Sequence, residues 1–433
     1  TSSWGATYTT GDVIGVAVDM SAGSITFYKN GSSQGAAYTD LASAMPDDGW
    51  ILYAFGYNGC NLTWNFGQRA FAHSVPTGHL KLCTANFPVP TIKDGSKHFS
   101  MLLYTPNGTT DRTLTGVGFS PNLGWFARRN TNGAGSMLFD TVRGATKELY
   151  APYTNAEDTV AESVKSFDAD GYTFGNNWPN ATGTGSDSWV AWNWKAGGAA
   201  SSNGDGDITS SVSANTTAGF SIITYAGTGT DADTVGHGLG VAPEMIIIKR
   251  RDNGSGGTNW RVWHTGLDDT KTLELNESGA SATQSGVFDT STPPTSTVFR
   301  PNDHVSVNTS GGTYVAYAFT SVKGYSKVDS YIGNGDSNGP FIYTGFRPAY
   351  ILVKNSVRNA HWGIYDVKRK SANENTYVYQ PNLNDAEDTS GHGFDLLSNG
   401  FKVRSNGSPY NHSGEKMIYL AIAERPFKYA NSR

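Results

Sequence analysis

Short apolar runs separated by glycine-rich turns occur along the whole chain and predict β-strands. Residues 13–18 and 25–28 are two such runs, joined by the turn Ser21-Ala22-Gly23. The second run is followed by Asn30-Gly31. An Asn-Gly pair beside an extended run favours a tight hairpin, because both central residues of a type I′ turn need a positive φ. This pattern predicts an all-β fold.

The same order of features occurs three times in the rest of the chain. Each copy has an aromatic opening residue, a Gly-x-x-Pro turn that ends 17 or 18 residues later, an apolar run, and a closing strand that starts 68 to 71 residues after the proline. The openers are Tyr104, Tyr225 and Tyr331, the prolines are Pro121, Pro243 and Pro348, and the closing strands start at Trp189, Tyr314 and Tyr419. A conserved spacing of this kind predicts three homologous tandem units.

The repeat spacing suggests four domains, with boundaries at 1–92, 93–197, 198–324 and 325–433. Each repeat is long enough to bury a core of its own. Residues 196–218 consist almost wholly of Gly, Ala, Ser, Thr, Asn and Asp, a composition typical of a linker or an exposed loop. The window 155–167 leaves helix and strand open, because two valines four residues apart make a weak helical stripe.

Composition narrows the classes of partner. The net charge is −5, and charged residues make up only 16% of the chain, which gives no electrostatic footprint for nucleic acid. The cations Lys249-Arg250-Arg251 end a strand and are interpreted as a solvated edge. No apolar run approaches the roughly 20 residues of a membrane helix, so we expect no membrane insertion. The two cysteines, Cys60 and Cys83, make no disulfide framework, and whether they pair stays open.

The N-terminal region resembles a known binding module. Residues 11–19 (GDVIGVAVD), 25–31 (ITFYKNG) and 64–68 (WNFGQ) are similar to the C-terminal half of a SPRY domain. The resemblance implies a concanavalin-like β-sandwich. Because the first half of that sandwich is missing, we expect residues 1–92 to complete a fold begun upstream, with an exposed inner face when taken alone.

The search for catalytic chemistry finds no P-loop, no G-x-S-x-G elbow and no H-E-x-x-H helix, so no enzyme activity and no cofactor are predicted. Asp140 and Asp366 occupy the same place in repeats one and three, and each precedes an arginine by three residues. This spacing predicts a local ion pair. Repeat two has His264 there. Two carboxylates across a sugar bond would make a glycosidase, and sequence alone leaves that open.

One loop partly matches a calcium site. Asn334, Asp336, Asn338 and Gly339 fit positions one, three, five and six of an EF-hand loop, but position twelve is Gly345 where a bidentate Glu is needed. We interpret the loop as a polar turn and predict no metal.

Aromatic residues are the remaining ligand candidates, because exposed rings can stack on sugars. Those in register between repeats are predicted to be core: Trp260, Trp263, Trp362 and Tyr365. Those in loop-like stretches are the predicted ligand-binding residues: Tyr153, Trp178, Tyr379 and Tyr410.

The closing strands of the Tyr-x-Ala-aromatic type and the tail Pro426-Phe427-Lys428-Tyr429-Ala430-Asn431 carry a second resemblance. With the SPRY-like start, the chain resembles structural or tail-fibre-like proteins of marine tailed phages. This implies a non-enzymatic component on the extracellular surface of a virion, which forms a homo-oligomer, contacts other virion proteins and attaches to a host-surface glycan. A polysaccharide depolymerase and a purely architectural protein are the alternatives.

Overall fold

The computed structural model describes residues 5–41, 61–86, 89–179, 187–252, 257–268, 270–288, 292–390, 392–407, 409–426 and 428. The chain divides into two compact units, unit 1 (Thr1–Pro88) and unit 2 (Val89–Arg433). In the described residues the regular elements are β-strands, apart from two single 3₁₀ turns, η1 (Thr84–Asn86) and η2 (Gly95–Lys97). The predicted all-β class is confirmed.

Unit 1 contains an antiparallel meander of β1 (Ile14–Asp19), β2 (Ser24–Lys29) and β3 (Ser32–Tyr38). Asn30 and Gly31 form the two-residue turn between β2 and β3, with φ of 49° and 82°. The predicted hairpin is therefore present. Alternate apolar side chains of β1, including Val16 and Val18, stay exposed in the described part of this unit.

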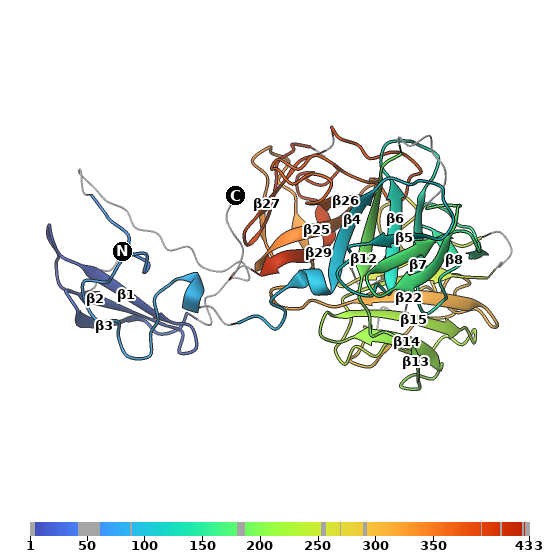
Figure 1. Ribbon diagram of the computed structural model, residues 1–433. Helices are drawn as coiled ribbons and strands as arrows, with labels where there is room; N and C mark the ends of the chain where they lie inside the picture. Colours follow the sequence, from blue (N-terminus) through green and yellow to red (C-terminus); the bar gives the residue numbers. More distant parts are fainter. Residues whose placement is uncertain are drawn as a thin grey trace. The chain divides into compact units, whose positions relative to one another are not determined.

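Three large antiparallel sheets build unit 2 (Figure 1). Sheet I has the order β4 (Phe99–Tyr104), β12 (Trp189–Trp194), β6 (Leu123–Arg128), β7 (Ser136–Asp140), β8 (Lys147–Tyr150), β9 (Asp158–Thr159). Sheet II has the order β13 (Ser201–Asn203), β14 (Ser210–Asn215), β15 (Phe220–Ala226), β22 (Thr313–Phe319), β17 (Met245–Arg250), β18 (Arg261–His264), β19 (Lys271–Glu274), β20 (Ala282–Thr283). Sheet III has the order β23 (Ser326–Ile332), β29 (Lys416–Pro426), β25 (Phe346–Asn355), β26 (Gly363–Asp366).

A small sheet accompanies each large one. The small sheet beside sheet I has the order β10 (Val164–Asp168), β11 (Gly171–Phe174), β5 (Arg112–Thr115). The one beside sheet II consists of β16 (Val235–Gly236) and β21 (Val298–Phe299). The one beside sheet III has the order β24 (Phe341–Tyr343), β28 (Gly400–Val403), β27 (Phe394–Leu397).

The three large sheets share one strand order at their centres: β4-β12-β6-β7, β15-β22-β17-β18 and β23-β29-β25-β26. In each, the closing strand pairs on one side with the opening strand and on the other with the strand after the proline. This central place explains why the closing strands are almost continuously apolar, since a strand with two neighbours and two covered faces has no contact with water.

One hydrophobic core joins the three sheets. It contains Trp192 of sheet I, Tyr317 of sheet II, and Tyr350 and Leu420 of sheet III. Two smaller clusters lie beneath sheets I and II. In Figure 1 the teal, lime-to-gold and orange-to-red sheets accordingly lie against one another.

Two stretches differ from the sequence expectation. Residues 196–218, expected to be a linker, contain β13 and β14, which extend sheet II, and Val212 of β14 is buried. Small polar residues suffice there because β14 pairs along its whole length with β15. The window 155–167 is extended, with β9 and the start of β10, so Val164 packs in a sheet.

Candidate functional site

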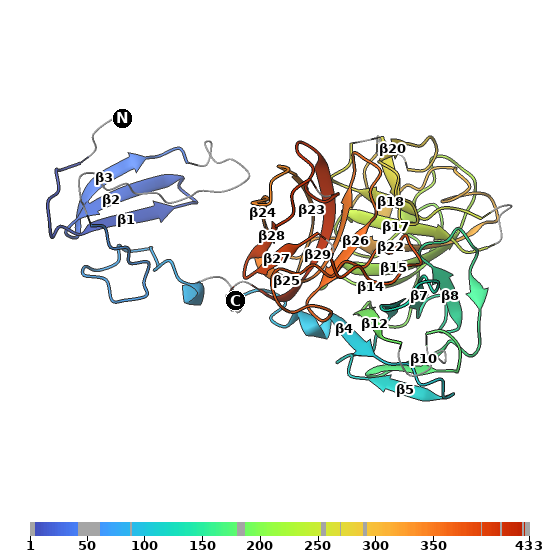
Figure 2. The ribbon, with the colours of Figure 1, turned by 90° about the horizontal axis from the view of Figure 1, so that it is seen from above.

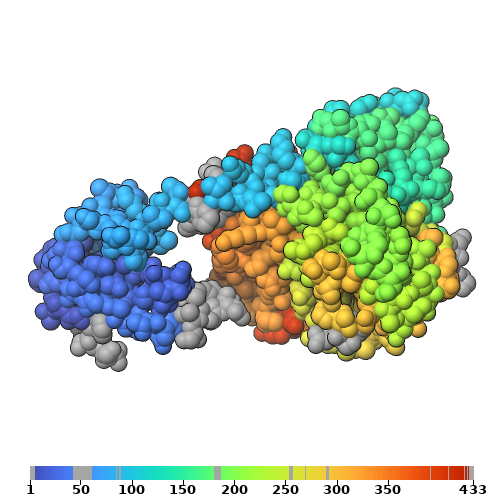
Figure 3. All heavy atoms as spheres, turned by 90° about the horizontal axis from the view of Figure 1, so that it is seen from below, coloured from blue at the N-terminus to red at the C-terminus, as the bar shows by residue number. Residues whose placement is uncertain are grey.

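A surface hollow of about 400 Å³ lies between residues that flank β4, β6 and β12 of sheet I and residues at the end of β14 of sheet II. It is lined by His98, Ser120, Asn122, Lys195, Ala196, Gly197, Gly198, Ala214, Asn215 and Thr216. Figure 3 shows this side of unit 2, where the light-blue surface that follows residue 90 borders the lime surface around β13 to β15.

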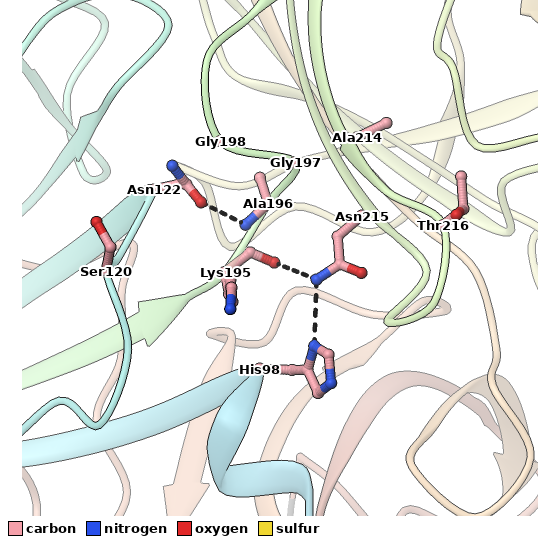
Figure 4. A pocket seen from close by; sticks show the side chains of 10 residues that line it. All are labelled: His98, Ser120, Asn122, Lys195, Ala196, Gly197, Gly198, Ala214, Asn215 and Thr216. Atoms are coloured by element: carbon pink, nitrogen blue, oxygen red, sulfur yellow. Dashed lines mark hydrogen bonds between the residues drawn. The ribbon is translucent and has the colours of Figure 1, made fainter. Parts of the chain in front are cut away.

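Two buried asparagines hold the wall of the hollow (Figure 4). Asn122 Oδ1 accepts a hydrogen bond from the backbone N of Ala196 at 2.9 Å. Asn215 Nδ2 donates to Lys195 O at 3.0 Å and lies 3.2 Å from His98 Nδ1. Since the amide nitrogen is the donor in both contacts, His98 Nδ1 is the acceptor and the ring proton lies on Nε2.

The electrostatics of the hollow favour binding over acid–base chemistry. Burial lowers the pKa of His98 below its ordinary value, and the nearby ammonium of Lys195 lowers it further, while Asp94 opposes both. His98 is therefore neutral at pH 7. The lining residues comprise one lysine, this histidine, amides, hydroxyls and small side chains, and no carboxylate. Such a wall can donate hydrogen bonds to a hydroxyl or an anion, but it holds no pair of carboxylic acids for hydrolysis.

The four predicted ligand-binding aromatics do not line this hollow. Tyr379 and Tyr410 are 1% and 0% exposed and lie in the core, so they cannot meet a ligand that arrives from solvent. Tyr153 and Trp178 are half-buried. The ring of Trp178 packs on Trp189 with centroids 5.4 Å apart. A role in ligand binding stays a prediction for Tyr153 and Trp178.

The aromatic residues expected to be core are mostly so. Trp260, Trp362 and Tyr365 are buried, and Trp263 is half-buried. Two of them reach into the preceding sheet: Trp260 Nε1 donates to Tyr150 O at 3.0 Å, and Trp362 Nε1 donates to Glu274 O at 2.9 Å.

The predicted carboxylate–arginine pairs are confirmed, and both are fully buried. Asp140 Oδ2 lies 2.5 Å from Arg143 Nε, and Asp366 Oδ2 lies 2.5 Å from Arg369 Nε. Burial opposes the charge of Arg369, but the carboxylates of Asp366 and Glu387 raise its pKa above the ordinary value.

A second carboxylate extends each pair into the neighbouring sheet. Glu157, which precedes β9, binds Arg143 at 3.1 Å and also Arg251, which follows β17 of sheet II, at 2.9 Å. In the same way Glu387, in the segment between β26 and β27, binds Arg369 at 3.3 Å, and it also binds Arg129, which follows β6 of sheet I, at 2.6 Å. These carboxylates tie the sheets together, so none of them is a free catalytic acid.

The three positions compared in the sequence make a closed ring of contacts. Asp140 of sheet I accepts from the hydroxyl of Tyr317 in sheet II at 2.8 Å. His264 of sheet II contacts Tyr419 O of sheet III at 3.3 Å. Asp366 of sheet III accepts from Trp192 Nε1 of sheet I at 3.0 Å. Each sheet thus contacts the closing strand of the next.

His264 takes part in this ring of contacts as a neutral imidazole. Its Nδ1 accepts from the backbone N of Gly266 at 2.9 Å, so Nε2 carries the proton that points at Tyr419 O. Burial lowers the pKa of His264 to about 4. The histidine is therefore a structural donor at pH 7.

The interpretation of Lys249-Arg250-Arg251 as a solvated edge is wrong for Lys249. Its side chain is buried, and Nζ donates to Thr154 O at 2.8 Å and to Thr258 O. Burial lowers its pKa to about 7. Lys354 of β25 is also buried, and burial lowers its pKa to about 7. The burial of Lys249 was not predictable from sequence because one of its acceptors, Thr154 O, belongs to a distant segment.

The calcium-like loop uses its side chains internally. Asn334 Oδ1 accepts from the backbone N of Asp336 at 3.0 Å, and Asp336 Oδ1 accepts from the backbone N of Asn338 at 2.7 Å. In the described residues no group of three or more His, Cys, Asp or Glu is arranged to hold a metal, and no helix there is long and apolar enough to cross a membrane. Cys60 and most of the tail after Pro426 lie outside the described residues.

A family model covers the region of the three sheets. The model described as Domain of unknown function (DUF7483) matches residues 94–426, which is more than half of the chain. The chain belongs to this family. The DUF7483 match includes all three large sheets and the hollow. The SPRY domain model matches residues 2–69 in unit 1, which confirms a partial SPRY domain ahead of the DUF7483 region. No curated protein and no solved structure matches the chain.

Proposed function

We propose that this DUF7483 protein is a viral structural protein, a tail-fibre or appendage component on the outer surface of a phage virion, which attaches to a host-surface glycan. The observation that carries the proposal is the closed ring of contacts between three sheets of one strand order. A body closed in this way is a stiff scaffold that presents its loops at fixed positions.

The proposal treats the three sheets as tandem copies of one unit. Their central strands follow the same order, and their inter-sheet contacts fall at equivalent places. Arg129 and Arg251 both follow the apolar strand after the proline, and each binds a glutamate of another sheet. Copies that differ mainly in their loops suit repeated contact with a surface better than a single active site.

The charged groups support binding rather than catalysis. Asp140 and Asp366 are neutralised by buried arginines, and the hollow near His98 has no carboxylate in its wall. A depolymerase needs two carboxyl groups about 5 to 10 Å apart across a substrate cleft. No observation in the described residues favours that alternative.

Attachment to a polysaccharide needs many weak contacts acting together. Copies of the chain and other virion proteins are the proposed partners, because linking several sites can raise a weak affinity by about 10² to 10⁴. Native mass spectrometry of the full chain tests this part. We expect an oligomer, and a strictly monomeric mass at micromolar concentration would remove self-association from the proposal.

A cell-binding assay tests the attachment itself. Fluorescently labelled full chain is incubated with candidate host cells before and after enzymatic removal of their surface polysaccharide. We expect binding that falls when the polysaccharide is removed, with no release of reducing ends from isolated polysaccharide. Binding that is unchanged by the treatment contradicts glycan attachment, and a steady release of reducing ends supports the depolymerase.

A further inference from the structure

Two exposed aromatic rings lie side by side on β24. Phe341 and Tyr343 are 45% and 57% exposed, whereas Ile342 between them is buried at 7%. They are the only exposed Phe, Tyr or Trp side chains among the described residues of unit 2. Since aromatic side chains carry a large apolar area, two of them left in water on one strand need an explanation.

The sheet geometry places both rings on one face. β24 is an edge strand of the order β24-β28-β27 (Figure 2). Residues two apart on a strand point to the same side, with their Cα atoms about 7 Å apart. Phe341 lies opposite Lys402, and Tyr343 lies opposite Gly400. The other face, with Ile342 and Phe401, packs into the core.

Gly400 keeps the surface between the rings flat. A Cβ at this position would lie 2.1 Å from Ile342 O and 3.1 Å from Cε2 of Phe341. The ring of Phe341 therefore reaches over the backbone of Gly400, and no side chain rises there. Polar groups stand beside this surface, because Lys402 of β28 lies opposite Asp395 of β27 in the strand register. Lys402 Nζ donates to Gly339 O at 2.7 Å, and Asp395 Oδ2 lies 3.4 Å from Arg404 Nε.

The small sheet that accompanies sheet I shows that the fold does not need these rings. In its edge strand β5, Thr113 and Thr115 are exposed and Leu114 between them is buried. Thr115 lies opposite Gly171, as Tyr343 lies opposite Gly400. The equivalent edge strand β5 thus forms with two threonines, so the aromatic rings of β24 are not required for the strand to pack.

We propose that Phe341 and Tyr343 form a carbohydrate-binding platform on which the C–H faces of pyranose rings stack, with Lys402 and Asp395 placed to bond sugar hydroxyls. Two side chains on one face of a strand, with Cα atoms about 7 Å apart, offer an elongated apolar surface to an extended polysaccharide. A stable protein partner would bury about 800 Å² on each side, far more than two side chains offer. The ligand class follows from the glycan attachment proposed above, on which this inference rests.

A glycan array with the full chain tests the platform. The variant Phe341→Thr/Tyr343→Thr introduces the pair that β5 carries, and threonine suits a strand. Each ring removed should weaken binding roughly tenfold, by analogy with other stacking platforms, so the double variant should bind about 100-fold more weakly. Tyr343→Phe keeps the ring and should stay within about threefold of wild type. Val357→Thr, at another exposed apolar position, serves as the matched control.

The outcomes separate this inference from the proposed function. If the wild type binds a glycan and the double variant binds it equally well, the platform is wrong and glycan attachment stands. If the wild type binds no glycan, both fall. Circular dichroism checks folding, and the single variants Phe341→Thr and Tyr343→Thr carry the test if the double variant does not fold.

Discussion

Replacing Asp366 by asparagine should destabilise the protein strongly although the two side chains have almost the same shape. Asp366 Oδ1 accepts from the backbone N of Lys368 and of Arg369 at 2.9 and 2.8 Å. Oδ2 accepts from Arg369 Nε at 2.5 Å and from Trp192 Nε1 at 3.0 Å. The single side-chain oxygen of asparagine can accept either from the two backbone amides or from Arg369 and Trp192, but not from both groups.

The magnitude follows from the groups that lose their partner. With the oxygen kept on the backbone amides, the new NH₂ group faces two other donors, Arg369 Nε and Trp192 Nε1. The charged hydrogen bond contributes about 1.5 to 3 kcal/mol and the neutral one about 1 kcal/mol. Glu387 still partners Arg369, so the loss should stay at the lower end of the 3 to 5 kcal/mol typical of a broken buried pair. We expect Asp366→Asn to lower the free energy of unfolding by about 3 kcal/mol.

Urea unfolding of the full chain, followed by tryptophan fluorescence and far-UV circular dichroism, measures this loss. Asp140→Asn is the matched comparison, because Asp140 makes the equivalent contacts with Arg143 and Tyr317. The double variant Asp366→Asn/Arg369→Met removes both charges and should recover part of the loss. A cost below about 1 kcal/mol for Asp366→Asn would refute the view that this pair joins sheets I and III.

Three further changes test other parts of the fold. The pKa of His264 is about 4 in the folded chain and near 6.5 in the unfolded chain, so the unfolded state binds more protons between these pH values. The free energy of unfolding should therefore drop by about 3 kcal/mol from pH 7 to 4. His264→Gln should remove that part of the drop in urea titrations. Lys249, with a folded pKa of about 7 against an ordinary value of 10.5, acts in the same direction at higher pH: its contribution to stability should rise by about 2 kcal/mol from pH 7 to 9, and an equal rise in Lys249→Met would contradict its burial. Gly171→Ala would place a Cβ 1.8 Å from Leu114 O, so we expect a loss of about 3 kcal/mol, and an unchanged melting temperature would show that β5 and β11 do not pair in this register.

Strands and turns were predictable from sequence because their signals are local. The spacing from each proline to its closing strand located the central strands, and Asn30-Gly31 located a hairpin, since turn chemistry and alternation act over a few residues. The pair of Asp140 with Arg143 was predictable for the same reason: three residues separate the partners in sequence.

Contacts between distant segments were not predictable. Tyr317 stands 177 residues from Asp140, and nothing in either stretch of sequence indicates the other. Tyr379 and Tyr410 follow loop-like patterns, yet their loops fold over sheet III and carry the rings into the core. Phe341 and Tyr343 could have been noticed as two aromatic residues two positions apart, but their exposure depends on Gly400 across the strand.

Immunogold electron microscopy of purified phage particles, of which the chain is proposed to be a component, tests the central claim most directly. An antibody raised against the full chain is applied to intact virions. The account predicts gold labels on the distal appendages of the tail. Particles that are labelled only after disruption, or not at all, would contradict a role on the virion surface.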